Sequence, residues 1–423
     1  MALTESGYKP RIIDDKIARY MGLFGALSIE GPKWCGKTWT ALNHANSVVY
    51  MLDPENDYAT REAAKLNPAA ILTGKKPLLV DEWQEVPGIW DAVRFASDRT
   101  KGKGLYILTG SVTPRTGSFA HSGAGRIARI RMRTMSLFES GDSSGSVSLS
   151  GLFKGGKIEP GASGLSQEKL IDLAIRGGWP ENVGVAKKDA GILPEQYNLA
   201  LARTDITSID NARRNPEMVL HLLAAVARTN ATPALLNTIA TDVQARFGQV
   251  ARQTVAEYLS ILSRLYVIEE IPQWFPELRD KLRLRKTPKR MLADPSIAIS
   301  ALRASPSELA RDPRTLGGIF ESLCLRDLLV YTEASGAKLS HYRDANGLEV
   351  DAIVELGTQW AGIEIKMGTH RVEEGATSLK RLRDKLVSKG ASAPAWLCVI
   401  TGGGPLYTRD DGINVIPVDC MKP

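Results

Sequence analysis

The sequence lacks several features that mark whole classes of protein. It holds only four cysteines, which lie far apart and form no CxxC pair: Cys35, Cys324, Cys398 and Cys420. This spacing argues against a disulfide framework and a zinc site, and it favours the reducing cytoplasm. No apolar run reaches the roughly 18–20 residues that a membrane-spanning helix needs. Residues 1–10 are polar, so the sequence predicts no secretory signal.

The chain has the composition of a globular protein, with 43% hydrophobic and 24% charged residues among 423. At roughly 100–200 residues per domain, this length predicts two to four domains. Strand and helix patterns alternate first, a helical middle follows to about Arg264, and strand patterns return from about His341. We therefore predict an α/β domain over residues 1–155, a helical part over 156–275 and an α/β domain over 276–423.

Four short apolar runs in the first part have the length of buried strands. They are Leu23 to Glu30, Ser47 to Leu52, Pro77 to Val80 and Gly104 to Leu108. Helical stretches such as Ile89 to Asp98 lie between them. Alternating strands and helices predict a parallel sheet covered on both faces. The Ser- and Gly-rich stretches at 140–150 and 155–164 are predicted to be loops.

Residues 31–38, GPKWCGKT, match the P-loop pattern G-x-x-x-x-G-K-[ST] without a mismatch. In such a loop backbone N–H groups point at phosphate oxygens, Lys37 reaches the β- and γ-phosphates, and the Thr38 hydroxyl binds magnesium. The match follows a predicted strand and opens a predicted helix, whose N-terminus favours anions. The alternative is a glycine turn before a helix. We predict that ATP with Mg²⁺ binds to Gly31, Pro32, Lys33, Trp34, Cys35, Gly36, Lys37 and Thr38.

Two carboxylates, Asp81 and Glu82, end the apolar run PLLV. Phosphoryl transfer needs positioning and charge neutralisation, so we predict that Asp81 holds magnesium and that Glu82 is the general base for the attacking water. An exposed acidic pair after a core strand is the alternative. The next strand ends in hydroxyl residues, and Thr109 or Ser111 is predicted to bond the γ-phosphate or its water. A simple exit from the strand would explain those hydroxyls as well.

Positive charge is unevenly distributed in a chain whose net charge is +7. One basic cluster comprises Arg126, Arg129, Arg131 and Arg133, and the other is the run Glu277 to Arg290. Basic patches suit nucleic acid or nucleotide phosphates, although a solvated surface explains them equally. Arg126 or Arg129 is also a candidate arginine finger, supplied in cis or by a neighbouring subunit of a homo-oligomer. A nucleic-acid contact or a plain salt bridge is equally compatible with either residue.

The helical middle ends in an order typical of a winged helix-turn-helix. Helical spacing over 215–227, 234–240 and 253–265 precedes a predicted strand over 266–271. The stretch Thr254 to Arg264 would be the recognition-type helix. Arg252 and Arg264 are compatible with DNA binding, and Glu257 is not. Many winged helices contact protein or act as lids, so a protein partner remains an alternative.

Carboxylates and a lysine in the last part resemble the PD-(D/E)xK nuclease pattern. Asp351 lies on a predicted strand, and Glu364 and Lys366 lie on one face of the next. Asp351 and Glu364 would bind magnesium beside a scissile phosphate, and Lys366 would stabilise developing charge. Glu321, on a predicted helix, would add a ligand. The pattern is short, and acids on a solvent-facing edge strand are the alternative.

Five segments in this order, GPKWCGKT, LLVDEWQ, ILTGS, GRIARIRMRTMSLFE and RGGWPE, resemble a family of prokaryotic AAA-type ATPases. Those proteins carry a C-terminal domain of unknown function related to restriction endonucleases. The resemblance runs from about Lys9 to about Val418. It implies a P-loop ATPase core, a helical lid, a winged-helix segment and an α/β restriction-endonuclease-like end. Val350 stands where a strict nuclease pattern has proline, which leaves retained cleavage in doubt because a fold can outlive its chemistry.

Two functions are compatible with these residues. One is an ATP-driven enzyme acting on DNA, with a C-terminal domain that cuts or grips it. The other is a nucleotide-controlled switch or scaffold with a protein partner and a silent nuclease-like domain. A GTPase or metabolic kinase is disfavoured, because the sequence contains no NKxD-type guanine motif.

Overall fold

A computed structural model describes residues 3, 6–55, 58–113, 121–209, 212, 214–233, 235–276 and 287–423. The chain divides into two compact units, residues 1–134 with 264–266 and residues 135–263 with 267–423. Within these ranges no helix is both long and apolar enough to cross a membrane. Most of the basic run Glu277 to Arg290, up to residue 286, lies outside the described residues.

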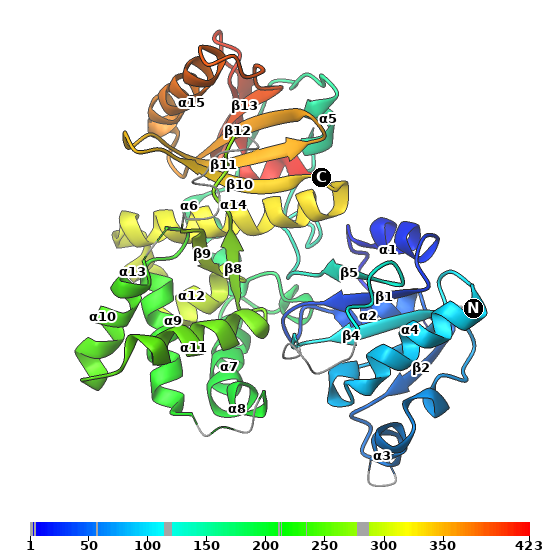
Figure 1. The fold of residues 1–423 in the computed structure, drawn as a ribbon. Helices are drawn as coiled ribbons and strands as arrows, with labels where there is room; N and C mark the ends of the chain where they lie inside the picture. Colours follow the sequence, from blue (N-terminus) through cyan, green and yellow to red (C-terminus); the bar gives the residue numbers. More distant parts are fainter. Residues whose placement is uncertain are drawn as a thin grey trace. The chain divides into compact units, whose positions relative to one another are not determined.

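The first unit is built on a five-stranded parallel sheet in the order β2-β3-β4-β1-β5 (Figure 1). The strands are β1 (Ala26–Glu30), β2 (Ser47–Tyr50), β3 (Leu78–Asp81), β4 (Tyr106–Gly110) and β5 (Ile127–Arg131). The four predicted strands and their parallel sheet are confirmed. The fifth strand, β5, was not predicted from the sequence, and it carries two of the clustered arginines, Arg129 and Arg131.

Helices cover both faces of this sheet, as predicted. They are α1 (Asp14–Met21), α2 (Lys37–Asn43), α3 (Ala59–Leu66) and α4 (Gly88–Thr100), with short 3₁₀ turns at Pro68–Ile71 and Trp83–Glu85. Leu27 and Ile29 of β1 share a buried cluster with Ile17 of α1, whereas Val80 of β3 shares another with Trp90 of α4. Side chains alternate between the faces of a strand, so each face gains its own apolar core.

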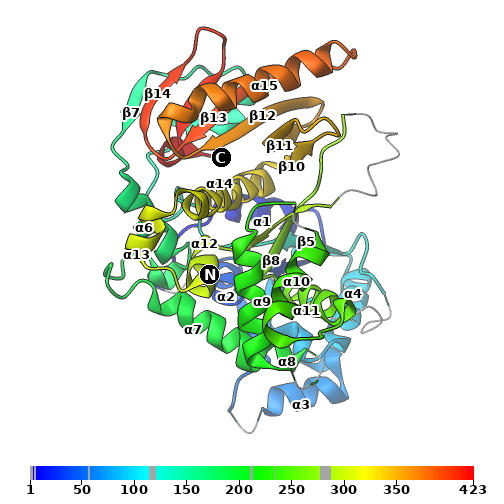
Figure 2. The same ribbon diagram turned by 90° about the vertical axis from the view of Figure 1, so that its left-hand side faces the viewer.

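The second unit contains a sheet in the order β10-β11-β12-β13-β15-β14-β7. Its strands are β7 (Gly161–Ser163), β10 (Lys338–Arg343), β11 (Glu349–Leu356), β12 (Gln359–Lys366), β13 (Trp396–Thr401), β14 (Gly404–Thr408) and β15 (Asn414–Pro417). Strands β10 to β12 form an antiparallel meander, and β13 runs parallel to β12. Helices α14 (Pro313–Ser335) and α15 (Val372–Val387) lie against this sheet on opposite sides (Figures 1 and 2).

The helical middle belongs to the second unit. Its helices are α6 (Gln167–Arg176), α7 (Ile192–Ala200), α8 (Ile206–Ser208), α9 (Pro216–Arg228), α10 (Leu236–Phe247) and α11 (Arg252–Arg264), with a π-helical turn at Leu201–Asp205. Two further helices of the same unit, α12 (Pro295–Leu302) and α13 (Pro306–Arg311), lie beyond it in the sequence. Helices α9 to α11 precede β8 (Ile268–Ile271), which pairs antiparallel with β9 (Lys289–Leu292). The order of three helices and a strand is confirmed, and the winged-helix identity stays a prediction. The expected start of α10, Ala234, lies outside the described residues.

The prediction of loops at 140–150 and 155–164 was wrong in part. Strand β6 (Val147–Ser148) pairs with β16 (Met421–Lys422), helix α5 (Leu149–Phe153) follows it, and β7 pairs with β14. Serine and glycine favour turns locally. Here their backbone groups are paired by strands more than 240 residues later, and local composition carries no signal of such partners.

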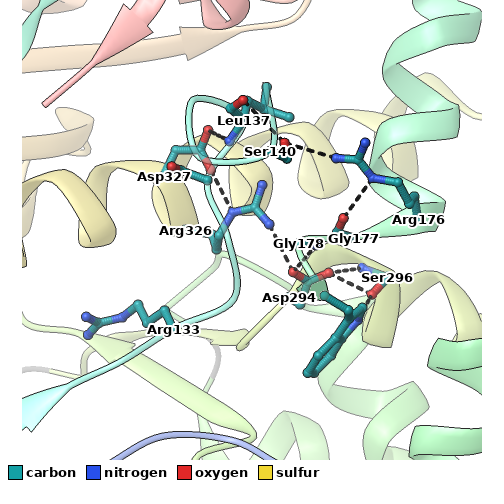
Figure 3. Close-up of polar contacts among 12 residues, drawn as sticks. Arg133, Leu137, Ser140, Arg176, Gly177, Gly178, Asp294, Ser296, Arg326 and Asp327 are labelled. Atoms are coloured by element: carbon teal, nitrogen blue, oxygen red, sulfur yellow. Dashed lines mark hydrogen bonds and ion pairs between the residues drawn. The ribbon is translucent and has the colours of Figure 1, made fainter. Parts of the chain in front are cut away.

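A buried ion network joins four segments of the second unit (Figure 3). The Arg326 side chain of α14 is 2% exposed and pairs with Asp294 Oδ2 at 2.9 Å and Asp327 Oδ1 at 2.6 Å. Asp327 Oδ2 accepts the backbone N–H of Leu137 at 3.0 Å, and Asp294 Oδ2 accepts that of Gly178 at 3.0 Å. Burial raises the pKa of Asp327 to about 6, although Arg326 opposes the shift.

This network gives a structural role to two of the segments that carry the family resemblance. A Cβ on Gly178, in RGGWPE, would lie 2.1 Å from the Met135 carbonyl oxygen, so only glycine fits. The neighbouring Trp179 donates its indole N–H to Ser296 Oγ at 2.9 Å. These residues therefore hold the unit together, and their chemistry is that of a buried, paired charge.

Candidate functional site

The P-loop connects β1 to α2 in the conformation that its glycines allow. Gly36 has φ 98°, in the left-handed region that favours glycine. A Cβ on Gly31 would lie 2.1 Å from the Met132 carbonyl oxygen. Trp34 also has positive φ, at 64°, and half of its side chain is exposed. Both glycines of the pattern are thus required by the backbone itself.

Lys37 and Thr38 open helix α2, as predicted. The Lys37 side chain is buried, and its Nζ donates to the Pro32 carbonyl oxygen at 2.8 Å across the loop. The Thr38 hydroxyl donates to Asp81 Oδ1 at 2.8 Å. The loop is therefore curled around its own lysine, and Thr38 faces the acidic end of β3.

Arg11 supports the P-loop, and the sequence did not reveal it. Its side chain is 6% exposed, and Nη1 donates to the Cys35 carbonyl oxygen at 2.7 Å. Nη2 donates to the Arg133 carbonyl oxygen at 2.8 Å. These partners are 24 and 122 residues away, so no local pattern could indicate them.

Asp81 is the centre of a hydroxyl cluster at the carboxyl ends of β3 and β4. Its Oδ1 accepts from Thr38 at 2.8 Å and from Thr109 at 2.6 Å. Burial raises the pKa of Asp81, whereas the two hydroxyl donors act in the opposite direction. Thr109 in turn accepts the backbone N–H of Glu82 at 3.4 Å. The cluster thus fixes the orientation of Asp81 beside the P-loop.

Glu82 has φ 54° and turns the chain away from the sheet. Its Oε2 accepts from the Ser111 hydroxyl at 2.9 Å and from the Gln84 side-chain amide. Gln84 was not anticipated, although it lies only two residues along the chain. The predicted roles of Thr109 and Ser111 at the γ-phosphate stay predictions, since both hydroxyls here hold carboxylates.

The clustered arginines make contacts within the first unit. Arg126 Nε pairs with Asp98 at 2.6 Å, and Arg129 Nη1 pairs with Glu30 at 3.2 Å. The Arg129 guanidinium also lies 4.6 Å from the centre of the Trp90 ring. These are the plain salt bridges that the sequence left open, and an arginine-finger role stays a prediction. The side chains remain 52% and 39% exposed.

The four C-terminal residues named from the sequence come together in the second unit. Lys366 Nζ pairs with Glu364 Oε2 at 2.6 Å and lies 3.6 Å from Asp351 Oδ2. Asp351 Oδ2 also accepts the Ile365 N–H at 2.9 Å. Glu321 faces this group from α14, where burial and the charge of Asp351 raise its pKa. The four residues that the sequence grouped into one candidate site therefore lie together in the structure.

A fifth residue, Lys289, was missed at this place. Its Nζ pairs with Glu321 Oε1 at 2.6 Å and with Asp351 Oδ1 at 3.3 Å. The side chain is 7% exposed. The sequence places Lys289 in a basic run that suits a nucleic-acid contact or a solvated surface equally. For this lysine the interpretation was wrong, because its ammonium group is buried against carboxylates.

Burial and neighbouring charges set the protonation of this cluster. Burial and the charge of Asp351 raise the pKa values of Glu364 and Glu321. Burial also opposes ionisation of Asp351, but Lys289 and Lys366 together hold its pKa below the usual range. Among the three acids of the cluster, Asp351 is therefore the one whose charged form is favoured most.

The residues as they stand do not fit the magnesium that nuclease chemistry would use. Two ammonium groups already pair with Asp351, Glu364 and Glu321. Throughout the described ranges, no group of three or more His, Cys, Asp or Glu residues is arranged to hold a metal ion. We therefore assign no cleavage step to this cluster.

We predict that the free energy of unfolding depends on pH through His341, which lies on β10 near this cluster. Burial, and then the charge of Lys289, lowers its pKa from 6.5 to about 4. The unfolded chain therefore binds more protons between these pH values, so stability present above pH 6.5 is lost as the pH falls towards 4. The shift corresponds to about 3 kcal/mol of unfolding free energy. In denaturation at several pH values, His341→Gln should remove this part of the dependence.

The exposed His370 provides the control for this measurement. His370→Gln should keep the wild-type difference between about pH 7 and about pH 4.5, the range over which His341 changes its charge in the unfolded chain. Buried acids with raised pKa values act in the opposite direction in the same range, so the informative quantity is the difference between variant and wild type. Equal pH profiles for wild type and His341→Gln would contradict the assignment.

Comparisons with known proteins cover most of the chain. The model of an AAA domain matches residues 24–140, and two domains of unknown function, DUF8612 and DUF4143, match residues 167–308 and 316–421. Two uncharacterized proteins, Rv2008c of Mycobacterium tuberculosis and Mb2031c of Mycobacterium bovis, are each 23% identical over 404 residues. These alignments span 92% of this chain and 79% of each relative.

A solved structure, the Walker-type ATPase PABY2304 of Pyrococcus abyssi, aligns with 13% identity and a TM-score of 0.43. The alignment covers 72% of this chain and 98% of that one. The AAA-domain match confirms the AAA-type P-loop ATPase domain that the sequence predicted. The restriction-endonuclease-like character of the C-terminal domain stays a prediction, because the match there is to a domain of unknown function.

Proposed function

We propose that this protein hydrolyses ATP with magnesium at the P-loop of its first unit. One observation carries the proposal. The carboxylate of Asp81 accepts the hydroxyls of Thr38 and Thr109 beside the P-loop. The next residue, Glu82, has its own carboxylate held by Ser111 and Gln84. The carboxylates that we propose as metal ligand and as general base thus come from neighbouring residues at one edge of the sheet.

Each residue of the site would have a separate role in ATP hydrolysis. Backbone N–H groups of residues 33–36 and the N-terminus of α2 would bind the phosphates, with Lys37 released from the Pro32 carbonyl to reach them. Thr38 and Asp81 would hold Mg²⁺, which neutralises phosphate charge when bound. Glu82 orients the attacking water and accepts its proton, while Ser111 and Gln84 fix the direction of its carboxylate. Arg126 or Arg129 would stabilise the transferring phosphoryl group, in cis or in a homo-oligomer.

We further propose that the second unit responds to the nucleotide as a switch or scaffold for a protein partner. The ion pairs of Lys366 with Asp351 and with the buried Glu364 favour this over action on DNA. The DNA-directed alternative rests on the exposed arginines, the proposed winged helix and the predicted endonuclease-like fold. These two candidates give opposite expectations for the same assay.

Steady-state ATP hydrolysis with and without DNA separates the two candidates. We expect turnover to change by less than about twofold on adding linear or plasmid DNA. The carboxylates of Asp81 and Glu82 are already oriented by hydroxyl groups of the first unit, so DNA is not required to position them. Asp351→Ala should leave the DNA response unchanged. A stimulation of about tenfold or more, with a steep dependence on salt, would instead establish DNA as the partner. Absence of any ATP hydrolysis would reject the first proposal itself.

A further inference from the structure

We infer that the ammonium group of Lys289 is a built-in cation that takes the place of a divalent metal among the C-terminal carboxylates. This inference deepens the proposed switch role of the second unit, and it does not depend on ATP hydrolysis. It starts from the donor set of the cluster, which the PD-(D/E)xK resemblance would assign to Mg²⁺.

The contacts of Lys289 use its full hydrogen-bonding capacity. Its Nζ lies 2.6 Å from Glu321 Oε1, 3.3 Å from Asp351 Oδ1 and 3.3 Å from the Asp351 carbonyl oxygen. An ammonium group has three N–H donors and no acceptor. Three oxygens from one helix and one strand therefore surround one cation, as ligands would surround a metal ion.

Asp351 has a donor on each of its carboxylate oxygens. Lys289 Nζ donates to Oδ1, and the Ile365 N–H donates to Oδ2. Lys366 Nζ forms an ion pair with Oδ2 at 3.6 Å. Glu364 is only 2% exposed and is paired with Lys366 at 2.6 Å. A metal ion would have to break these ion pairs, which water and salt screen weakly because the groups are largely buried.

The pairing of strands β8 and β9 fixes the backbone position of Lys289. This lysine is the first residue of β9, opposite Ile271 of β8 in the antiparallel pair. Its side chain is 7% exposed, so it has little room to turn into solvent. By contrast, Lys380 of α15 is 32% exposed and pairs with Asp411 at 3.2 Å on the surface. Lys380 is therefore a matched lysine without the proposed role.

Manganese binding to the nucleotide-free, full-length protein tests the inference. With Mn²⁺ as the probe, bound metal is measured by electron paramagnetic resonance for wild type, Lys289→Ala and Lys380→Ala. We expect Lys289→Ala to gain one Mn²⁺ site, with binding at least about tenfold tighter than wild type shows at this place. The added Asp351→Asn substitution should abolish the gain. Lys380→Ala should behave as wild type.

Two results would overturn the inference. One is a Mn²⁺ site in the wild type that Glu321→Gln or Asp351→Asn removes. The other is a folded Lys289→Ala protein that gains no site. Should Lys289→Ala fail to fold, the comparison of wild type with Glu321→Gln decides alone: unchanged Mn²⁺ binding supports the inference. ATP turnover of the same preparations reports separately on the proposed ATPase.

Discussion

Replacing Glu82 with glutamine is expected to lower kcat for ATP hydrolysis by about 10²–10⁴-fold, the usual contribution of a general base. The amide can still receive the Ser111 hydroxyl, which donates to Glu82 in this structure at 2.9 Å, but it cannot accept a proton from water. ATP binding should change little, because the P-loop and Lys37 are untouched. Steady-state hydrolysis and equilibrium binding of a fluorescent ATP analogue measure the two quantities.

Two further variants test whether the loss of hydrolysis is specific to Glu82. Lys37→Ala should abolish hydrolysis and weaken ATP binding as well, because it removes the positive charge that meets the phosphates. Glu85→Gln is the matched control, since Glu85 lies on the same 3₁₀ turn as Gln84 without a proposed catalytic role. Normal turnover of Glu82→Gln would remove Glu82 from the proposed mechanism, whatever the other variants show.

Replacing Arg326 with methionine should destabilise the second unit by about 3–5 kcal/mol, the cost of breaking a buried ion pair from one side. Methionine retains much of the apolar bulk, so the loss reports mainly on charge. It would leave Asp294 and Asp327 buried without their partner, and these acids receive the backbone N–H groups of Gly178 and Leu137. Chemical denaturation followed by circular dichroism measures the change.

A surface pair serves as the control for Arg326. Arg383 pairs with Asp384 on α15, and both side chains are substantially exposed. Arg383→Met should cost less than about 1 kcal/mol, as exposed ion pairs do. A loss of similar size for the two arginines would show that the buried network contributes no more than surface charge.

Much of the ATP site follows from local patterns in the sequence. The P-loop, Asp81 and Glu82 stand at the ends of short apolar strands, and parallel strands bring their carboxyl ends to one edge. Thr109 and Ser111 could be named for the same reason. In the last part, the alternation of a strand placed Glu364 and Lys366 on one face. Spacing within a few residues was enough for each of these positions.

Other parts of the two sites depend on residues that are distant in sequence. Arg11 reaches the Cys35 carbonyl, and Lys289 reaches Glu321 and Asp351. The strand at Gly161–Ser163 pairs with β14 across more than 240 residues. No periodicity or composition encodes such partners, because the chain must first fold to bring them together.

The P-loop pattern and its strand-end acids were therefore determined by the sequence itself, since backbone geometry and residue spacing fix them locally. Only the tertiary structure decided what surrounds them. It showed that the segments MSLFE and RGGWPE hold a buried arginine, and that a lysine from a basic run lies among the C-terminal carboxylates. A buried charge needs an ion-pair partner, whereas an exposed charge can be solvated by water, and burial is a property of the packed chain.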